Sequence, residues 1–343
     1  MAAIVMADDG IAFDGAMAER EPLGGAEIAF VALAEALAQR RHKVEVRNRC
    51  RTPVTHNGVS WAPLAGGVPE RCDLYIGNRG HRTIGLVRRA GVRIFWLHNP
   101  AFYLRKPRNL WRLARWRPTL VVTGAYHRAT VPRFLPGPEP LIIPYGILDP
   151  FRAVPPREPP PPRAIFTSNP LRGLDWLLDL WETHIAPAVP QAELHIYAGA
   201  AVYGLAGSPA ARRIEAILDR AGRLAALGVI CHPPVGHADL AERLRGARVM
   251  LYRGDPGETF CLAVAEAQAA GVPAVVTPLG ALAERVVDDA TGRVAPDDKA
   301  FAAAAISALR DDALWRRWHR AALASQRGCS WDEAAVRFES LMR

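Results

Sequence analysis

The 343-residue sequence lacks the patterns of several common protein classes. Its five cysteines are widely scattered and form no Cys-x-x-Cys pair, so neither a disulfide framework nor a zinc site is predicted. The first ten residues carry two aspartates and no basic residue, which argues against a secretory signal. The longest nearly uncharged stretch, 261–283, is interrupted by Glu266, Gly271 and two prolines, so it does not form a membrane-spanning helix. We therefore expect a cytoplasmic protein.

Common catalytic signatures are missing as well. The sequence holds no GxGxxG, GxxxxGK[ST], HExxH or GxSxG pattern, and no Asp-x-Asp pair that would hold a metal-bound nucleotide diphosphate. These absences argue against an ordinary dinucleotide enzyme, a P-loop NTPase and a metal hydrolase. We expect neither a metal ion nor a cofactor.

The composition is that of a folded protein, with 50% hydrophobic and 22% charged residues, and the length predicts about two domains. Charge is uneven, because residues 1–155 hold 22 Lys and Arg against 12 Asp and Glu, whereas the remainder holds 21 against 22. Either the N-terminal half faces an anionic partner or the chain is simply rich in arginine; the second explanation does not account for the asymmetry.

A proline-rich stretch divides the chain near its middle. Half of the 14 residues in 150–163 are proline, which excludes a helix or a central strand there. We expect an N-terminal domain over 1–150, a hinge over 151–163 and a C-terminal domain over 164–329. A Ser-x-x-Glu capping box at Ser330 predicts a terminal helix over 330–343.

Both halves alternate short β-rich runs with helical patterns, which predicts α/β domains with parallel sheets. In the first helix after the opening strand, Phe30, Leu33, Ala34 and Leu37 mark a buried face. The expected strands of the first half are 2–6, 43–46, 73–78, 93–99, 119–124 and 141–146. Those of the second half are 164–169, 194–199, 229–232, 249–254 and 273–278. Open parallel sheets bind ligands at the carboxyl ends of their strands, so we expect two doubly wound, Rossmann-like domains facing across a cleft.

The most informative stretch is 254–286, where a Gly/Pro turn follows a strand and a helix is expected to begin near Thr259. Glu258 then lies at the mouth of this helix, and Glu266 follows about 12 Å further along the same axis. This spacing suits an extended polyol ligand held at its two ends. The helix-terminal N–H groups between the carboxylates would bind a phosphate by donating hydrogen bonds to it. These groups belong to Thr259, Phe260 and Cys261. The alternatives are an acid favoured by the helix dipole at 258 and a solvated charge at 266.

Glu258-x7-Glu266, followed by Gly-Val-Pro, a strand and Glu284, resembles the EX7E signature of retaining GT-B glycosyltransferases, most closely the GT4 family. Further segments resemble this family in the same order: 24–27, 97–99, 142–151, 171–178 and 194–199. The resemblance covers nearly the whole chain. It implies a GT-B enzyme that transfers a sugar, with retention and without a metal, from a UDP- or GDP-linked donor to a hydroxyl acceptor.

The resemblance also implies roles for individual residues. Glu258 would bind hydroxyls of the donor sugar and Glu266 the ribose of the nucleotide. Arg172 would neutralise the leaving diphosphate, and His98 would lie near the donor sugar and the acceptor hydroxyl. The loop of Gly24 and Gly25 would admit the donor phosphate, backbone of 230–234 would contact the base, and the terminal helix would pack on the N-terminal domain.

The sequence departs from the family at one cation. The family usually has a further arginine about six residues before the position of Arg172, where this chain has Phe-Thr-Ser-Asn over 166–169. Asn169 or Arg253 would then help Arg172 to stabilise the phosphate charge. For His98 the alternative is a core or capping histidine, and for Gly24 and Gly25 a simple loop before a helix.

A basic stretch over 101–117 stands out in the first half. It has six Lys and Arg and no acid between Arg105 and Arg117, with Phe102, Tyr103, Trp111 and Trp116 interleaved. Leu110, Leu113 and Ala114 are expected to form an apolar face opposite Arg108, Arg112 and Arg115. An anionic membrane, a nucleic acid and a plain solvated helix are the alternatives. Since many GT-B enzymes extend lipid-linked glycans, we favour peripheral membrane contact and expect no nucleic acid.

Two other functions remain open. A sugar-nucleotide epimerase or hydrolase uses a donor cleft without a separate acceptor, but the EX7E context resembles transferases more closely. A non-catalytic protein that binds nucleotide-sugars or nucleic acid is the alternative from another class.

Overall fold

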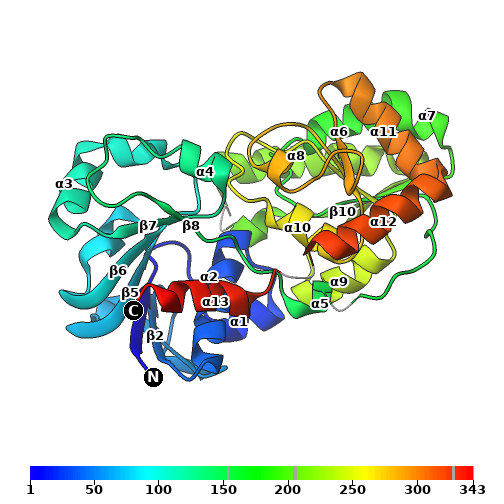
Figure 1. The fold of residues 1–343 in the computed structure, drawn as a ribbon. Helices are drawn as coiled ribbons and strands as arrows, with labels where there is room; N and C mark the ends of the chain where they lie inside the picture. The colour runs from blue at the N-terminus through cyan, green and yellow to red at the C-terminus, as the bar shows by residue number, and fades with distance from the viewer. Residues whose placement is uncertain (153, 204–206, 327–328, 343) are drawn as a thin grey trace. The chain divides into compact units, whose positions relative to one another are not determined.

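The computed structural model describes residues 1–152, 154–203, 207–326 and 329–342, and the chain folds into two compact units (Figure 1). Unit 1 contains Met1–Glu21, Gly25–Gly146 and Cys329–Arg343, and unit 2 contains Pro22–Gly24 and Ile147–Gly328. The proline-rich stretch 150–163 thus lies within unit 2. Ala153, within the expected hinge, and Arg343, at the end of the expected terminal helix, lie outside the described residues.

Unit 1 is built on an eight-stranded sheet of order β3-β4-β2-β1-β5-β6-β7-β8. All neighbouring strands are parallel except β3 and β4. The strands are β1 (Ala3–Ala7), β2 (Lys43–Asn48), β3 (Val54–His56), β4 (Val59–Pro63), β5 (Arg71–Asn78), β6 (Arg89–Trp96), β7 (Thr119–Val122) and β8 (Leu141–Ile142). All six expected strands of this half are present. The β3–β4 hairpin was not expected, although Asn57 and Gly58 at its turn both have the positive φ typical of an Asn-Gly hairpin.

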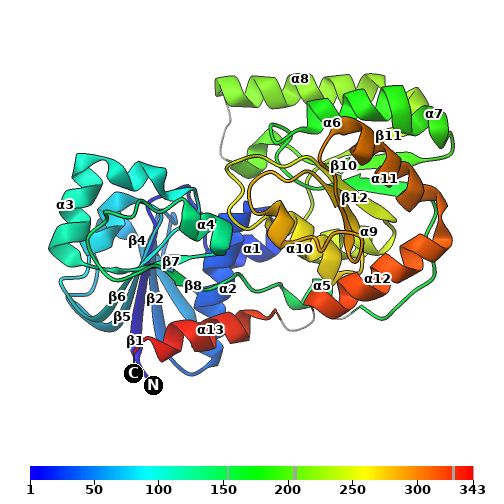
Figure 2. The same cartoon turned by 45° about the horizontal axis from the view of Figure 1, so that its top comes forward.

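Helices cover the sheet of unit 1 on both faces (Figure 2). They are α1 (Gly15–Arg20), α2 (Gly25–Gln39), α3 (Pro107–Trp116), α4 (Ala125–Ala129) and α13 (Trp331–Ser340). The expected buried residues of α2 are all inside, and the capping box of Ser330 and Glu333 is formed at the start of α13. Helix α13 packs on α2, where Arg40 pairs with Asp332 at 2.9 Å and with Glu339 at 2.7 Å.

Unit 2 is built on a six-stranded, fully parallel sheet of order β11-β10-β9-β12-β13-β14. The strands are β9 (Arg163–Phe166), β10 (Glu193–Tyr197), β11 (Val229–His232), β12 (Val249–Tyr252), β13 (Ala274–Val276) and β14 (Gly292–Val294). The first five were expected, and the three-residue β14 was not. Counted from β9, the order is 3-2-1-4-5-6, the order of a Rossmann-like doubly wound sheet, and it reverses between β9 and β12. The expectation of two doubly wound parallel-sheet domains is confirmed.

The helices of unit 2 lie on both faces of its sheet, with α6 and α8 on one side and α9 and α10 on the other (Figures 1 and 2). They are α5 (Asp149–Arg152), α6 (Leu174–Leu180), α7 (Ala186–Ala188), α8 (Pro209–Arg223), α9 (His237–Arg245), α10 (Leu262–Ala269), α11 (Asp298–Arg310) and α12 (Asp312–Gln326). The expectation that 150–163 contains no helix is wrong at its first residues. Pro150 lies in the first turn of α5, where a missing N–H costs no helical hydrogen bond.

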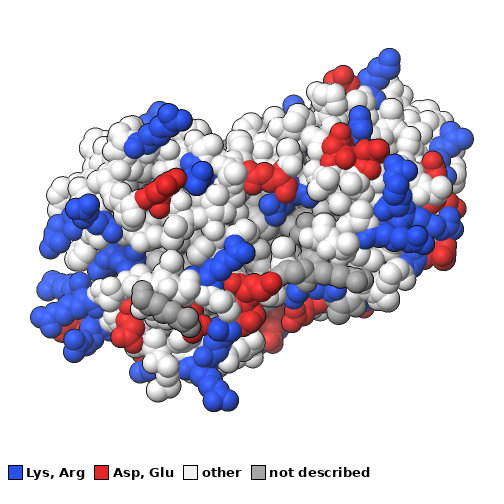
Figure 3. Space-filling view, in the orientation of Figure 1, with Lys and Arg blue, Asp and Glu red and all other residues white. Residues whose placement is uncertain are grey.

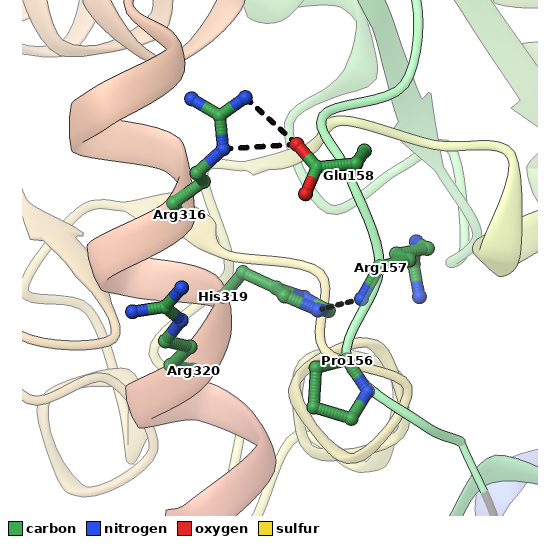
Figure 4. Close-up of a pocket in the computed structure, with 6 residues that line it drawn as sticks. All are labelled: Pro156, Arg157, Glu158, Arg316, His319 and Arg320. Atoms are coloured by element: carbon green, nitrogen blue, oxygen red, sulfur yellow. Dashed lines mark hydrogen bonds and ion pairs between the residues drawn. The ribbon is translucent and has the colours of Figure 1, made fainter.

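The rest of the proline-rich stretch is held against α12 by hydrogen bonds and an ion pair. The backbone N–H of Arg157 donates to Nε2 of His319 at 3.1 Å, and Arg316 pairs with Glu158 at 2.7 Å. These residues line a pocket of about 200 Å³ together with Pro156 and Arg320 (Figure 4). Because proline cannot donate backbone hydrogen bonds, side chains of a neighbouring helix hold this segment in place. Among the described residues, no helix combines the length and the apolar character needed to cross a membrane.

Candidate functional site

The carboxyl ends of β9 and β12 form the point where the strand order of unit 2 reverses, which is the usual ligand position in an open α/β sheet. The segment after β9 carries Asn169 and Arg172. The segment after β12 carries Arg253 and Glu258. Four of the predicted site residues therefore follow two adjacent strands of one sheet.

Arg172 and Glu258 form an ion pair at this edge, with 2.5 Å between Nη1 and Oε1. The hydroxyl of Tyr252 donates to the same oxygen, and the hydroxyl of Ser168 lies 3.1 Å from that of Tyr252. The side chain of Glu258 is 5% exposed and that of Arg172 is 38% exposed. A buried carboxylate is thus fixed by two donors, while its cationic partner remains partly open to an anion.

The contact between Arg172 and Glu258 also affects the charge states of Arg172 and Tyr252. Burial alone lowers the pKa of the Arg172 guanidinium, but the carboxylate of Glu258 outweighs burial and raises it above the ordinary value. The pKa of Tyr252 is raised well above its usual range by burial and by its acidic neighbours. At neutral pH the tyrosine is therefore a neutral hydrogen-bond donor and the arginine a cation.

Helix α10 begins at Leu262, three residues later than the expected start near Thr259. Cys261 adopts a left-handed conformation with φ of 63°, so Thr259, Phe260 and Cys261 precede the helix and do not supply its free N–H groups. The separation of about 12 Å along one helix between Glu258 and Glu266 is therefore wrong, because only Glu266 is helical.

The late start of α10 has a tertiary cause. The carbonyl of Glu258 accepts a hydrogen bond from the N–H of Ala281 at 2.9 Å, which holds this backbone in a loop. Gly280, with φ of +60°, makes the approach possible, because a Cβ there would lie 2.6 Å from the carbonyl oxygen of Glu258. Arg285 lies over the ring of Phe260 at 4.3 Å and covers the same loop.

Glu266 is buried on α10, with its side chain only 5% exposed, so the alternative of a solvated surface charge is excluded. Its Oε1 has no hydrogen-bond partner among the described residues, and Nε2 of His237 lies 3.8 Å from it. Burial raises the pKa of Glu266 to about 8. Burial also lowers the pKa of His237 to about 4, so this imidazole is neutral at physiological pH.

Asn169 and Arg253 shape the loop that carries Arg172. The side-chain oxygen of Asn169 accepts from the N–H of Leu171 at 3.0 Å, and its carbonyl accepts from the N–H of Arg172 at 2.9 Å. The side chain of Arg253 packs on Gly173, where a Cβ would lie 2.6 Å away, and its guanidinium lies over Trp176 at 5.4 Å. Asn169 thus orients the arginine loop, and Arg253 adds a second cation beside it.

A second polar cluster lies at the carboxyl ends of the strands in unit 1. His98 is buried, with Nδ1 bonded to the hydroxyl of Tyr145 and Nε2 bonded to the side-chain oxygen of Asn78. Asn78 donates in turn to Asp8 at 2.5 Å, and Arg79 pairs with Asp8 at 2.9 Å. Burial, with nearby Arg79 and His127, lowers the pKa of His98 well below its usual value. The imidazole is therefore a neutral group in a fixed network.

The glycine pair before the first long helix lies where the sequence analysis expects it. Helix α2 begins at Gly25, and Gly24 is buried immediately before it. Neither glycine has a positive φ. The pair thus has no special backbone conformation, and its distinctive feature is the missing side chain at a helix N-terminus.

The basic stretch forms a 3-10 turn over Ala101–Arg105 and helix α3, and Figure 3 shows Lys and Arg gathered at the end of unit 1 where α3 lies. The expected apolar face is correct for Leu113, which is buried, and wrong for Ala114, which is exposed. Asn109 takes its place in the interior by donating to the carbonyl of Tyr103 at 2.6 Å. Trp111 and Phe102 are 63% and 54% exposed. The helix thus presents aromatic and basic side chains together.

Sequence reasoning missed Tyr252, His237, Asn78 and Asp8. Asn78 and Asp8 stand at strand ends, where the sequence offered a signal. Tyr252 and His237 gave no sequence signal, because only the fold brings them next to Glu258 and Glu266.

Comparison with known proteins finds similarity in the second half of the chain. Residues 162–311, within unit 2, match the family described as Glycosyl transferases group 1. The D-inositol 3-phosphate glycosyltransferase of Xylanimonas cellulosilytica is 37% identical over 136 residues, 39% of this chain and 32% of that protein. The same enzyme of Streptomyces avermitilis is 36% identical over 137 residues, 39% of this chain and 29% of that protein. The chain thus matches about a third of the length of these relatives.

Solved structures match along the whole chain. Sucrose-phosphate synthase from Thermosynechococcus elongatus superposes with a TM-score of 0.75 at 17% identity, covering 99% of this chain and 98% of that one. HepE of Anabaena, solved with UDP and glucose, gives 0.72 at 14% identity, covering 100% and 99%. WaaG, a glycosyltransferase involved in lipopolysaccharide biosynthesis, gives 0.69 at 15% identity, covering 99% of each chain. These likenesses show that the fold is GT-B.

Proposed function

We propose that this protein is a retaining glycosyltransferase of the GT4 type, which moves a sugar from a UDP- or GDP-linked donor to a hydroxyl acceptor without a metal ion. The observation that carries the proposal is the pair of Arg172 and Glu258 at the strand-order reversal of unit 2. The match of residues 162–311 to Glycosyl transferases group 1 supports it, because both residues lie in that range.

The donor diphosphate is the group that Arg172 suits best. In the reaction, the bond between the anomeric carbon and the diphosphate oxygen breaks, and both electrons leave with the nucleoside diphosphate. A guanidinium that is fixed in place but 38% exposed can stabilise the negative charge that develops there. Arg253 adds positive charge beside it, which takes over part of the role of the arginine that the family has near 166–169.

Glu258 is suited to bind the donor sugar. Its Oε1 already accepts hydrogen bonds from Arg172 and Tyr252, so we assign Oε2 to a sugar hydroxyl. A carboxylate held in this way orients the sugar. Its two hydrogen bonds restrict the movement that it would need to attack the anomeric carbon as a nucleophile. We therefore favour attack by the acceptor oxygen on the face from which the diphosphate leaves, with the acceptor proton passing to the leaving phosphate.

Glu266 takes the ribose of the nucleotide in this proposal, and backbone of 230–234 takes the base. The buried carboxyl with an unpartnered Oε1 needs a hydrogen-bonding ligand, which a ribose hydroxyl supplies. We assign the loop of Gly24 and Gly25 to the donor phosphate. We assign His98 to the acceptor side, where it acts by fixing the network of Asn78 and Tyr145.

We further propose that 101–117 contacts an anionic membrane from the cytoplasmic side, so that the acceptor is lipid-linked. The exposed Trp111 and Phe102 would enter the headgroup region, while the surrounding cations attract anionic lipids. The exposed aromatic rings of the 3-10 turn and of α3 favour a lipid surface over plain solvation.

The test is an assay with UDP- and GDP-sugars and a panel of hydroxyl acceptors, in which product sugar and released nucleotide are measured separately. We expect transfer to acceptor, and we expect Glu258→Gln to lower turnover at least tenfold while the protein stays folded. Glu215→Gln, on the exposed surface of α8, is the matched control. Nucleotide release without transfer would favour a hydrolase or epimerase, and unchanged turnover in Glu258→Gln would remove this residue from the site.

A further inference from the structure

Helix α9 begins beside the buried carboxyl of Glu266, and its first residue is His237. Nε2 of His237 lies 3.8 Å from Oε1 of Glu266, which is too long for a hydrogen bond between them. The side chains are 15% and 5% exposed. Two polar groups therefore face each other inside unit 2 without being bonded.

Both side chains have an atom that lacks a partner among the described residues. These atoms are Oε1 of Glu266 and Nδ1 of His237. Buried polar atoms in folded proteins are almost always hydrogen-bonded, and leaving one unpaired is destabilising. In the described part of the chain, Oε1 of Glu266, the atom that faces Nε2 of His237, therefore lacks a hydrogen-bond donor, which a ligand hydroxyl supplies.

The start of α9 supplies further donors at the same place. Its N-cap residue is Gly236, which has no side chain to cap the helix, and the first-turn N–H groups lack intrahelical acceptors. The ring of Phe151 meets the imidazole of His237 edge-on, with 6.1 Å between ring centres. This contact fixes the plane of the imidazole, so its nitrogens have defined directions.

A hydroxyl is the group that fits between the two side chains. A hydroxyl can donate to a carboxylate oxygen and accept from an imidazole N–H at the same time. Two such bonds of ordinary length can meet at one oxygen when the outer atoms are 3.8 Å apart. A neutral imidazole carries one N–H donor, which this arrangement requires.

We propose that His237 completes the ribose subsite that Glu266 begins, and that it thereby determines the preference of the protein for ribonucleotides over deoxyribonucleotides. The inference rests on the proposed function, since it assumes that a nucleotide binds to unit 2. His237 is a specificity residue in this scheme: it contacts a ribose hydroxyl and takes no part in bond breaking.

The experiment measures, by calorimetric titration of the full chain, the affinities of UDP and GDP and of their 2′-deoxy and 3′-deoxy analogues. For the nucleotide that binds, we expect at least one deoxy analogue to bind wild type at least tenfold more weakly. In His237→Phe the parent nucleotide should lose about tenfold in affinity, while that analogue should bind as it does to wild type. His237→Gln, which keeps a side-chain donor, should recover part of the preference.

The outcomes separate the inference from the proposed function. If no nucleoside diphosphate binds wild type, the proposed function fails and this inference fails with it. If nucleotides bind but His237→Phe weakens parent and analogue equally, the residue has only a structural role and the inference alone is overturned. Melting temperatures without ligand show whether each variant is folded. If His237→Phe does not fold, the affinities of His237→Gln for the parent nucleotide and the analogue test the inference.

Discussion

The guanidinium of Arg172 donates to the carboxylate of Glu258 across 2.5 Å, although 86 positions separate the two residues in the chain. The pairing of β9 with β12 brings them together, because each residue follows the carboxyl end of one of these strands. This edge of unit 2 holds the most buried charge pair among the predicted site residues, and the following predictions depend on it.

Replacing Arg172 tests whether its charge acts on the leaving group. We expect Arg172→Gln to lower kcat/KM about 100-fold or more, the usual effect of losing one preorganised charge-stabilising donor. Arg172→Lys keeps the charge and should retain part of the activity, although it loses the fixed geometry of the guanidinium. Steady-state kinetics measure both effects. Arg213→Gln, on the exposed surface of α8, should leave activity unchanged, and an Arg172→Gln enzyme as active as that control would contradict the assignment.

Tyr252→Phe tests whether the tyrosine orients Glu258. The substitution removes one hydroxyl that donates to Oε1 of Glu258 and leaves the ring in place. A hydrogen bond to a charged group contributes about 1.5–3 kcal/mol, so turnover should fall roughly 10- to 100-fold. Turnover is measured at saturating donor, and circular dichroism checks the fold. If kcat stays the same, Glu258 needs only Arg172 to hold it.

The stability of the protein should depend on pH through Glu266. Burial raises its pKa from 4.5 to about 8, so the folded chain holds this proton more tightly than the unfolded chain. The contribution of Glu266 to stability is thus complete below pH 4.5 and is lost as the pH rises through 8. Glu266→Gln removes this loss. Relative to wild type, its free energy of unfolding should rise with pH by at most about 1.4 kcal/mol per unit.

Urea denaturation at pH 5.0 and at pH 8.5 measures this difference, with Glu215→Gln as an exposed control. A variant that is equally stabilised or destabilised at both pH values would show that the carboxyl of Glu266 is solvated in solution.

Metal independence is tested by chelation. With Arg172 and Arg253 at the diphosphate, we expect activity to stay within about twofold after EDTA treatment and dialysis, since fixed cations supply the charge stabilisation. Transfer rates with and without added Mg²⁺ or Mn²⁺ provide the measurement. A loss of activity that one of these ions restores would overturn this part of the proposal.

The basic helix predicts binding to anionic vesicles. Trp111→Ser combined with Phe102→Ser should lower the bound fraction several-fold, because both rings are exposed and contribute little to the core. Sedimentation with vesicles containing phosphatidylglycerol, compared with neutral vesicles and at two salt concentrations, measures the effect. Equal binding to both vesicle types would contradict the electrostatic part of this assignment, and a double variant that binds as well as wild type would contradict the aromatic part.

Much of the fold could be predicted from the sequence because β-rich runs of four to seven residues alternate with helical periods. The prediction missed three strands: β14 and β3 have three residues each, and the five-residue β4 follows β3 after the turn at Asn57 and Gly58. Such segments pair because of their neighbours, and their composition alone gives little signal.

The sequence singled out candidate site residues, whereas their geometry depended on the fold. The spacing of Glu258 and Glu266 singled out both residues, but the start of α10 depends on Gly280, whose place against Glu258 is fixed by tertiary packing. His237 illustrates the same limit, since nothing in its sequence context shows that it faces Glu266. Residue types and spacing thus suggest candidate side chains, and strand order decides which of them meet.

The most direct test of the central claim is a crystal structure of the protein with a bound nucleotide-sugar donor. We predict that the diphosphate lies within hydrogen-bonding distance of Arg172 and that the sugar hydroxyls contact Glu258, at the carboxyl ends of β9 and β12. A donor bound elsewhere on the molecule, with these two side chains untouched, would contradict this claim.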